Sequence, residues 1–159
     1  MASSDTGARA RLAVKLGAAT VALLLPMLVQ LEGQVNRTYR DPIGVLTSCV
    51  GHTGPELRMG QVWTDEQCAQ QLADDVLKHS KFLTCITYRP LSDGNKAAFA
   101  SFEFNVGSEA FCNSTLARKA NSGDLAGACA ELSRWTRAGG VVWPGLVKRR
   151  ALEREVCES

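Results

Sequence analysis

The sequence predicts an α+β fold that is predominantly helical, in which a small β-hairpin region lies between an N-terminal apolar helix and a series of C-terminal helices. Three patterns support this prediction. A strongly apolar run covers residues 16–31. Turn chemistry at residues 41–44 separates segments of strand character, and a capping-box pattern at residues 64–67 opens a stretch with helical spacing of its apolar residues.

The apolar run at residues 16–31 has the features of a membrane-seeking segment. It follows three basic residues, Arg9, Arg11 and Lys15. This order is typical of a signal sequence or signal anchor whose basic end stays in the cytoplasm. The run is slightly short for a membrane span and Gly17 weakens it, but no small-x-small cleavage site precedes Glu32. We therefore expect an uncleaved anchor in residues 1–31 and a second domain in residues 32–159.

Two carboxyl side chains lie nine residues apart directly after this run. We expect a helix start around Glu32, then a strand, and then a turn at residues 41–44 (Asp-Pro-Ile-Gly) that folds the chain back. Glu32 and Asp41 can then face one cleft, and the hydroxyl of Thr47 on the returning strand can hold a water beside Asp41. Two such carboxyls suffice to split a glycosidic bond, because one acts as the acid and the other handles water. The spacing alone equally allows purely structural roles, with Glu32 as a helix cap, Asp41 as a turn residue and Thr47 as an ordinary strand residue.

The remainder of the chain has the pattern of successive helices. A capping box at residues 64–67 predicts a helix of about four turns from Asp65 toward Lys81. Ser92 opens a second helix, which ends near Gly107, a residue suited to a left-handed cap. Further helix starts are expected at Ser108, Ser114 and Asp124, with a break at residues 121–123, and a final helix follows Pro144 and Gly145.

Five blocks of residues carry a likeness to a known family. They are Glu32-Gly33 with Asp41, Thr47 and Gly51-His52-Thr53-Gly54; Phe102–Gly107; Ser114-Thr115-Leu116; Arg134-Trp135 with Ala138-Gly139-Gly140; and Gly145-Leu146 with Arg149-Arg150 and Glu153. In order and spacing, these blocks resemble the phage-type lysozymes, the muramidases of glycoside hydrolase family 24. The resemblance covers about residues 32–157 and implies a two-lobed fold with a small β-hairpin lobe and a C-terminal helical lobe.

The same resemblance implies a chemistry. It is acid-assisted hydrolysis of the β-1,4 bond between N-acetylmuramic acid and N-acetylglucosamine in peptidoglycan glycan strands, by a monomer that needs no cofactor and no metal. Glu32 would be the general acid, Asp41 the base or charge stabiliser, and Thr47 the water-positioning hydroxyl. Three alternatives stay open: a secreted lysozyme with a cleaved signal, a lytic transglycosylase, which needs only the acid, and a non-catalytic wall-binding protein.

An uncleaved, marginally hydrophobic anchor joined directly to such a lysozyme resembles the signal-arrest-release endolysins of lambdoid phages. The resemblance implies export by the host secretion machinery, arrest in the host inner membrane through residues 16–31 with the catalytic domain in the periplasm, and later release to the periplasm. While the anchor spans the bilayer, Glu32 is held at the membrane interface, out of register with Asp41 and Thr47, so we expect an inactive enzyme. No cysteine lies in the anchor, so thiol exchange from that segment is not the expected trigger.

Six cysteines form an even set in a chain that is expected to be exported, which indicates disulfides. Fifteen pairings of six cysteines are possible. Because neighbouring cysteines are expected on adjacent elements, pairing in sequence order is favoured: Cys49 with Cys68, Cys85 with Cys112, and Cys129 with Cys157. Free buried thiols of a cytoplasmic protein are the alternative.

The charge balance argues against nucleic acid as a partner. From Glu32 onward, 15 basic side chains balance 15 acidic ones, so no general positive field exists. Structural roles are expected for several further polar and aromatic residues: a buried hydrogen-bonding role for His52 rather than a zinc site, backbone contacts for Asn105 at a helix end, pairing of Glu103 with Arg149 or Arg150, and packing for Trp135. Trp143 is the indole that could stack on sugar rings.

Overall fold

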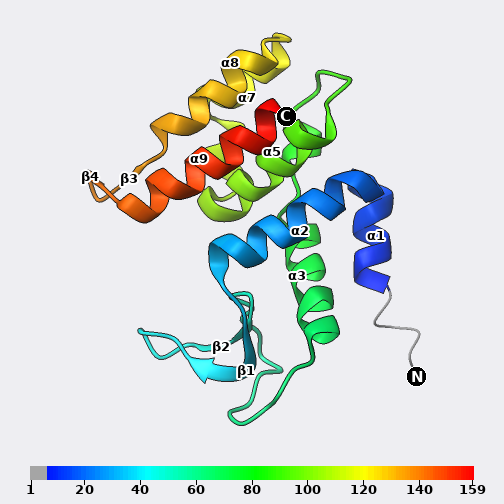
Figure 1. Cartoon of the computed structure of the whole chain (residues 1–159), viewed down its shortest axis with the longest axis vertical. Coiled ribbons are helices and arrows are strands. Elements are labelled where there is room, and N and C mark those ends of the chain that lie inside the picture. The colour runs from blue at the N-terminus through cyan, green and yellow to red at the C-terminus, as the bar shows by residue number, and fades with distance from the viewer. Residues whose placement is uncertain (1–6) are drawn as a thin grey trace. The chain divides into compact units, whose positions relative to one another are not determined.

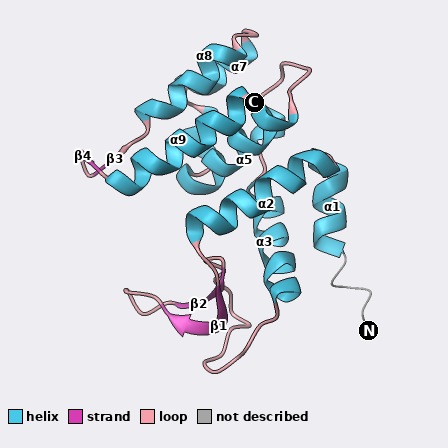
Figure 2. Cartoon of the chain, viewed as in Figure 1, coloured by secondary structure: helices cyan, strands magenta, loops and turns pink. Residues whose placement is uncertain are grey.

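The structure, a computed structural model, describes residues 7–159, so the first six residues of the expected N-terminal segment lie outside the described residues. The chain divides into two compact units that meet at Lys78 and His79. Figures 1 and 2 show the elements in order: α1 (Gly7–Leu16), α2 (Ala18–Glu32), β1 (Val35–Arg40), β2 (Leu46–Cys49), α3 (Asp65–His79), α4 (Phe82–Cys85), α5 (Asp93–Val106), α6 (Ser108–Cys112), α7 (Thr115–Asn121), α8 (Leu125–Glu131), β3 (Arg137–Ala138), β4 (Val141–Val142) and α9 (Pro144–Glu158). This confirms the predicted class, α+β and predominantly helical.

The predicted N-terminal apolar helix is confirmed as α2, which covers the apolar run from Ala18 onward, and a further helix, α1, holds the basic segment that precedes it. Gly17 separates α1 from α2 with a φ of 93°, a conformation that glycine adopts without a Cβ clash. The two helices are bent by 117° at this point. Among residues 7–159, no single helix is both long enough and apolar enough to cross a membrane. The bent pair of α1 and α2 meets the criteria of length and composition only when the two helices are taken together.

Polar groups of α1 contact α3. The backbone N–H of Arg9 donates to Gln70 Oε1 at 3.2 Å, and its guanidinium pairs with Glu66 at 3.0 Å. Arg11 lies 3.9 Å from Asp74. These pairs are exposed, so solvent screening leaves each of them only a weak contribution to stability. Two of the three basic residues that precede the apolar run, Arg9 and Arg11, therefore lie against acidic side chains of α3.

The apolar side chains of the run are folded into the protein, but not all of them are tightly packed. The buried leucines of the two helices are Leu12, Leu16, Leu24, Leu25 and Leu28. Between α1, α2 and α3 lies a partly open pocket of about 690 Å³, whose mostly aliphatic walls include Ala13, Leu25 and Leu72. The pocket opens to the surface, so some of the apolar groups of α1 and α2 line a solvent-accessible groove rather than the core.

Helix α3 begins as the sequence predicts. The Thr64 hydroxyl accepts from the Gln67 N–H at 3.1 Å, and Gln67 Oε1 accepts from the Thr64 N–H at 2.9 Å, which confirms the reciprocal capping box. The helix ends at His79, two residues before the expected end at Lys81.

The second unit is organised around α5, which packs along α9. Its start at Ser92 and its end at Gly107, where φ is 90°, confirm the predicted boundaries. The predicted helix starts at Ser114 and Asp124 are also confirmed, since each side chain accepts a backbone N–H of the helix that follows it.

An aromatic cluster forms the core of this unit. The ring centroid of Phe111 lies 6.3 Å from that of Phe82, 6.1 Å from that of Phe99 and 5.8 Å from that of Phe102. Trp135 lies 5.1 Å from Phe102, edge to face, which confirms its packing role.

The three predicted disulfides are all present, and no cysteine of the chain is free. Cys49 joins Cys68 within the first unit, and the two other bonds, Cys85 to Cys112 and Cys129 to Cys157, lie within the second.

Candidate active site

Asp41 occupies the first position of the β1–β2 turn, where the backbone holds its carboxylate in place. Asp41 Oδ1 accepts the N–H of Ile43 at 3.0 Å and the N–H of Val45 at 2.8 Å. The turn closes through the Asp41 carbonyl, which accepts from Gly44 at 2.9 Å, and Gly44 has a φ of 88° that only glycine adopts easily. In the described part of the chain, no hydrogen bond engages Asp41 Oδ2. One carboxylate oxygen is therefore used to orient the group and the other is available.

Thr47 is connected to Asp41 through one backbone carbonyl. The Val45 carbonyl accepts from the Asp41 N–H at 2.9 Å and from the Thr47 hydroxyl at 3.0 Å. Thr47 is paired with Tyr39 in the antiparallel ladder and is 5% exposed. Because its proton is used by Val45, its hydroxyl oxygen keeps lone pairs that can accept from a water. The structure thus brings Asp41 and Thr47 together at one turn.

Glu32 lies at the end of a helix, so the expected helix start at this position is wrong. It is the last residue of α2 and is exposed. Gly33 caps the helix with a φ of 76° and donates its N–H to the Val29 carbonyl. Only Gly33 and Gln34 separate Glu32 from β1, so α2 delivers the carboxyl directly to the start of the hairpin. The orientation of α2 therefore decides where this carboxyl lies.

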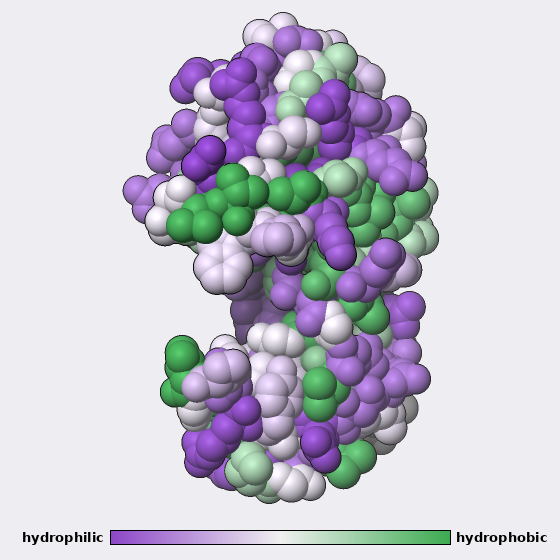
Figure 3. Space-filling view, turned by 60° about the vertical axis from the view of Figure 1, so that its left-hand side comes forward, coloured by the Kyte–Doolittle hydropathy of each residue, from purple (hydrophilic) through white to green (hydrophobic). Residues whose placement is uncertain are grey.

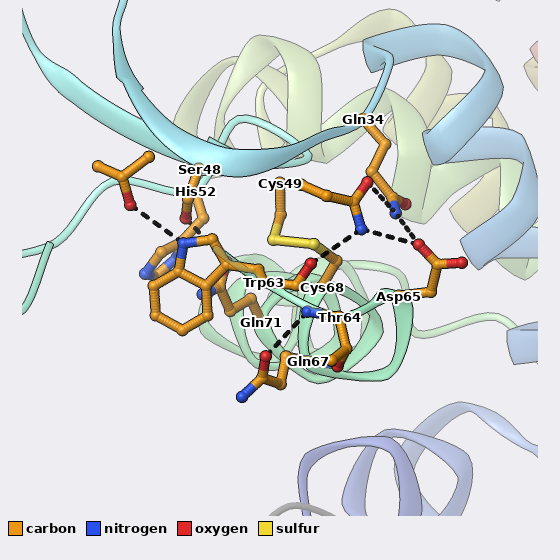
Figure 4. The surroundings of a disulfide bond; sticks show 12 residues. Gln34, Ser48, Cys49, His52, Trp63, Thr64, Asp65, Gln67, Cys68 and Gln71 are labelled. Atoms are coloured by element: carbon orange, nitrogen blue, oxygen red, sulfur yellow. Dashed lines mark hydrogen bonds between the residues drawn. A yellow bond between two sulfur atoms is a disulfide. The ribbon is translucent and has the colours of Figure 1, made fainter. Parts of the chain in front are cut away.

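The hairpin is fastened to α3 near the disulfide between Cys49 and Cys68 (Figure 4). Asn36 on β1 donates to Asp65 Oδ1 at 2.8 Å and to the Trp63 carbonyl at 3.1 Å. Ser48 at the end of β2 donates to Gln71 Oε1 at 2.9 Å. These contacts hold both strands of the hairpin on one helix.

The segment at residues 61–63 supports β1 from its other side, a feature that the sequence analysis missed. The Thr38 N–H donates to the Gln61 carbonyl and the Trp63 N–H donates to the Asn36 carbonyl, both at 2.9 Å. Trp63 Nε1 also donates to the Thr38 hydroxyl at 3.0 Å. Strand β1 is therefore flanked on both edges, which stabilises the turn that carries Asp41. The short segment has no alternating pattern that could have predicted this.

His52 forms the most strongly perturbed electrostatic cluster of this unit. Its Nδ1 lies 2.9 Å from Asp75 Oδ2 on α3, and its Nε2 lies 2.5 Å from Glu56 Oε1. The hydrogen bond to Asp75, opposed by burial and reinforced by Glu56, raises the pKa of His52 to about 9. The pKa of Glu56 is lowered, chiefly by the hydrogen bond with His52. The predicted buried hydrogen-bonding role is confirmed, and the histidine is a cation at neutral pH.

The other singled-out residues belong to the second unit. Arg149 and Arg150 both pair with the fully buried Glu153. Asn105 Oδ1 accepts from Arg150, so its role is structural, but its partner is a guanidinium rather than the expected backbone groups. Glu103 accepts the N–H of Lys81 at 2.8 Å. Within residues 7–159, no group of three or more His, Cys, Asp or Glu side chains could hold a metal ion.

Comparison with known proteins agrees with this architecture. The phage lysozyme family model matches residues 29–153. A signal-arrest-release (SAR) endolysin of bacteriophage PS119 is 42% identical over 127 residues, which cover 80% of this chain and 76% of that protein. The muramidase domain of SpmX from Asticaccaulis excentricus superposes with a TM-score of 0.75 at 28% identity, covering 91% of this chain and 97% of that one. The active form of the P1 phage endolysin Lyz has the same fold, with a TM-score of 0.76 at 23% identity over 97% of this chain and 93% of that one.

The fold and these similarities define a glycoside hydrolase of the lysozyme class, a muramidase whose substrate is peptidoglycan. The chain belongs to the phage lysozyme family.

Proposed function

We propose that this muramidase is an endolysin in which Glu32 is the general acid, Asp41 is the base or charge stabiliser, and Thr47 positions the attacking water. Glu32 donates its proton to the glycosidic oxygen as the bond to the anomeric carbon breaks. Water adds to that carbon and loses its proton to Asp41. The observation that supports this assignment best is the turn at residues 41–45, where one Val45 carbonyl holds both the Asp41 backbone and the Thr47 hydroxyl.

The assignment is tested with purified protein on peptidoglycan. Glu32→Gln should reduce lysis by ~10²- to 10⁴-fold, because an amide cannot protonate the leaving oxygen. Asp41→Asn keeps an oxygen for the two turn N–H groups, so the fold should persist while activity falls. Glu155→Gln, an exposed carboxyl of α9, is the matched control and should be fully active. Near-normal lysis by folded Glu32→Gln would refute the role of the acid.

The reaction product separates hydrolysis from the transglycosylase alternative. Hydrolysis adds water and leaves a reducing N-acetylmuramic acid end, whereas a transglycosylase leaves an anhydro sugar. Mass spectrometry of the soluble fragments distinguishes the two, and anhydro products would refute the role of Asp41 and Thr47 in handling water.

We further propose that residues 1–31 act as a signal anchor, with export by the host secretion machinery, residence in the host inner membrane and later release to the periplasm. The 15 residues of α2 span about 22 Å, short of a hydrocarbon core of about 30 Å. Straightening the joint at Gly17 would produce one helix over residues 7–32, about 39 Å long, whose apolar residues 16–31 cover about 24 Å and whose basic side chains can extend to the headgroups. The anchored form would thus be a straight helix and the released form the bent pair.

The contacts of α1 and α2 support this two-state element. In the bent form, Arg9 and Arg11 pair with Glu66 and Asp74, while a straight anchor would place both cations at the cytoplasmic headgroups. A pocket of about 690 Å³ remains partly open between α1, α2 and α3, and this is consistent with helices that can both pack on the protein and leave it. Because Glu32 ends α2, a change in the position of α2 moves the acid with it. Release would therefore switch the enzyme on.

Fractionation of expressing cells before and after depolarisation tests the anchor. Full-length, inactive protein should be found in the membrane of energised cells and active protein in the periplasm afterwards. Mass spectrometry of the N-terminus distinguishes the cleaved-signal alternative, which predicts a shortened, soluble chain in energised cells.

A further inference from the structure

The hairpin β3–β4 carries apolar side chains that the proposed muramidase site does not use. Its strands are joined by Gly139 and Gly140 with φ values of 59° and 78°, the geometry of a type I′ turn. Val141 is 61% exposed and Val142 is 45% exposed. Because neighbouring residues of a strand point to opposite faces, each face of the hairpin presents a valine to solvent.

Trp143 extends this apolar surface onto α9. Its backbone N–H donates to the Thr136 carbonyl at 2.9 Å and its Nε1 donates to the Ala138 carbonyl at 3.1 Å. The indole is therefore held against the hairpin although it is 54% exposed. One helical turn later, Val147 is 44% exposed and donates its N–H to the Trp143 carbonyl. We refer to Val141, Val142, Trp143 and Val147 as the hairpin ridge.

Positive charge flanks the hairpin ridge. Arg134, Arg137 and Lys148 are exposed, and the segment 132–152 contains no Asp or Glu. Glu131, which precedes the segment, is almost fully buried and pairs with Lys119 at 2.7 Å and with Arg134 at 3.5 Å, so Arg137 and Lys148 carry most of the exposed positive charge of the segment. Figure 3 turns the β3–β4 side of Figure 1 toward the viewer and shows hydrophobic side chains open at the surface among hydrophilic ones.

We propose that the hairpin ridge docks the protein on an anionic phospholipid bilayer. Exposed apolar side chains bounded by cations match a membrane surface, where tryptophan lies at the headgroup level, aliphatic groups enter the acyl boundary, and Lys and Arg attract anionic lipid. A sugar ring could stack on the Trp143 indole, but the three exposed valines of the hairpin ridge offer no hydrogen bond to the hydroxyls of a glycan strand and would gain more from an apolar environment. A second copy of the chain would bring like charges together. The bilayer is therefore the occupant that both charge and apolarity favour.

This docking surface lies on residues 79–159 and does not depend on the anchor proposed for residues 1–31. Its consequence is that the catalytic chain stays near the membrane surface after the N-terminal segment has left the bilayer. Binding would be reversible and sensitive to salt, since cations supply part of the attraction.

The test uses the full chain with Trp63→Phe and Trp135→Phe, which leaves Trp143 as the reporter of its own environment. With vesicles that contain phosphatidylglycerol, the emission of Trp143 should shift to the blue. With vesicles of phosphatidylcholine alone, or at high salt, the shift should be lost. An unchanged emission with anionic vesicles would overturn the proposal, because the ridge would then remain in water.

A pair of matched variants separates the ridge from the rest of the chain. Val141→Ser with Val142→Ser should weaken vesicle binding about 10-fold, and Lys148→Gln about 5-fold. Met59→Ser with Val62→Ser removes apolar groups of the first unit that are 59% and 80% exposed, and this variant should bind like wild type. Thermal melts by circular dichroism verify that the variants are folded. Equal losses of vesicle affinity in the ridge and control variants would overturn the proposal. A wild-type dimer that the Val141→Ser, Val142→Ser variant converts to monomer would overturn it as well. So would binding to purified peptidoglycan, but not to vesicles, that depends on the hairpin ridge.

Discussion

Replacing His52 by asparagine should destabilise the protein in a strongly pH-dependent way. The histidine is buried between Asp75 and Glu56, and these carboxylates raise its pKa from 6.5 to about 9. A group whose pKa is higher in the folded state binds its proton more tightly there, so it stabilises the fold at pH values where the unfolded histidine is still protonated. The contribution is therefore complete below pH 6.5 and is lost as the pH rises through about 9.

The magnitude follows from the size of the shift. At 1.36 kcal/mol for each pKa unit, a rise from 6.5 to about 9 corresponds to roughly 3 kcal/mol of unfolding free energy. Glu56 is more than half exposed, so solvent screens its share of the stabilisation. The lower end of the expected stabilisation is then about 2 kcal/mol. The His52→Asn variant should lose about 2 to 3 kcal/mol relative to wild type at pH 6, and clearly less at pH 10.

Urea denaturation followed by circular dichroism at both pH values measures these differences. His79→Asn is the matched control, because His79 is exposed and packs edge to face on Phe104 at 6.0 Å. Its loss of stability should be small and the same at both pH values. A double-mutant cycle with Asp75→Asn should assign most of the coupling to the Asp75 contact. If His52→Asn lowers stability equally at pH 6 and pH 10, charge on His52 is not the cause and the reasoning fails.

Three other perturbations have defined outcomes. Replacing Cys129 and Cys157 by serine should lower the unfolding free energy by about 2 to 4 kcal/mol, measured by denaturation, since the open chain regains loop entropy; an unchanged stability would contradict the disulfide. Glu153→Gln should cost about 3 to 5 kcal/mol because it leaves two buried arginines without their carboxylate, and a melting temperature equal to that of wild type would contradict this. Gly17→Leu combined with Thr20→Leu should hold the chain in the membrane and delay lysis, since apolar residues favour the straight anchored helix; lysis on the wild-type schedule would refute the anchor mechanism.

The β-hairpin shows what local sequence determined. The residues 41–44 dictated the turn because Asp accepts backbone N–H groups two and four residues on and Gly adopts a positive φ, and both facts are independent of the rest of the fold. The helix starts at Ser92, Ser114 and Asp124 were predictable for the same reason, since a cap involves only its own first turn. The disulfide pairs followed once the elements were placed in order.

The course of the chain around Glu32 shows what local sequence could not determine. The apolar run predicted the helix that became α2, but not the bend at Gly17 or the helix α1 before it, because the direction of a strongly bent joint depends on what each helix packs against. The sequence likewise did not reveal that Asp75 and Glu56 enclose His52, since these groups come from elements that only the tertiary structure brings together.

The sequence by itself determined the fold class, the helix caps, the turn at residues 41–44 and the family likeness of this protein. These features depend on contacts within a few residues, or on a pattern of residues along the chain. Only the tertiary structure decided that the basic segment forms its own helix bent back from the apolar helix α2, that Glu32 ends a helix, and that the hairpin ridge stays exposed. Such features are set by the balance of burial and charge between distant segments, and no short stretch of sequence encodes that balance.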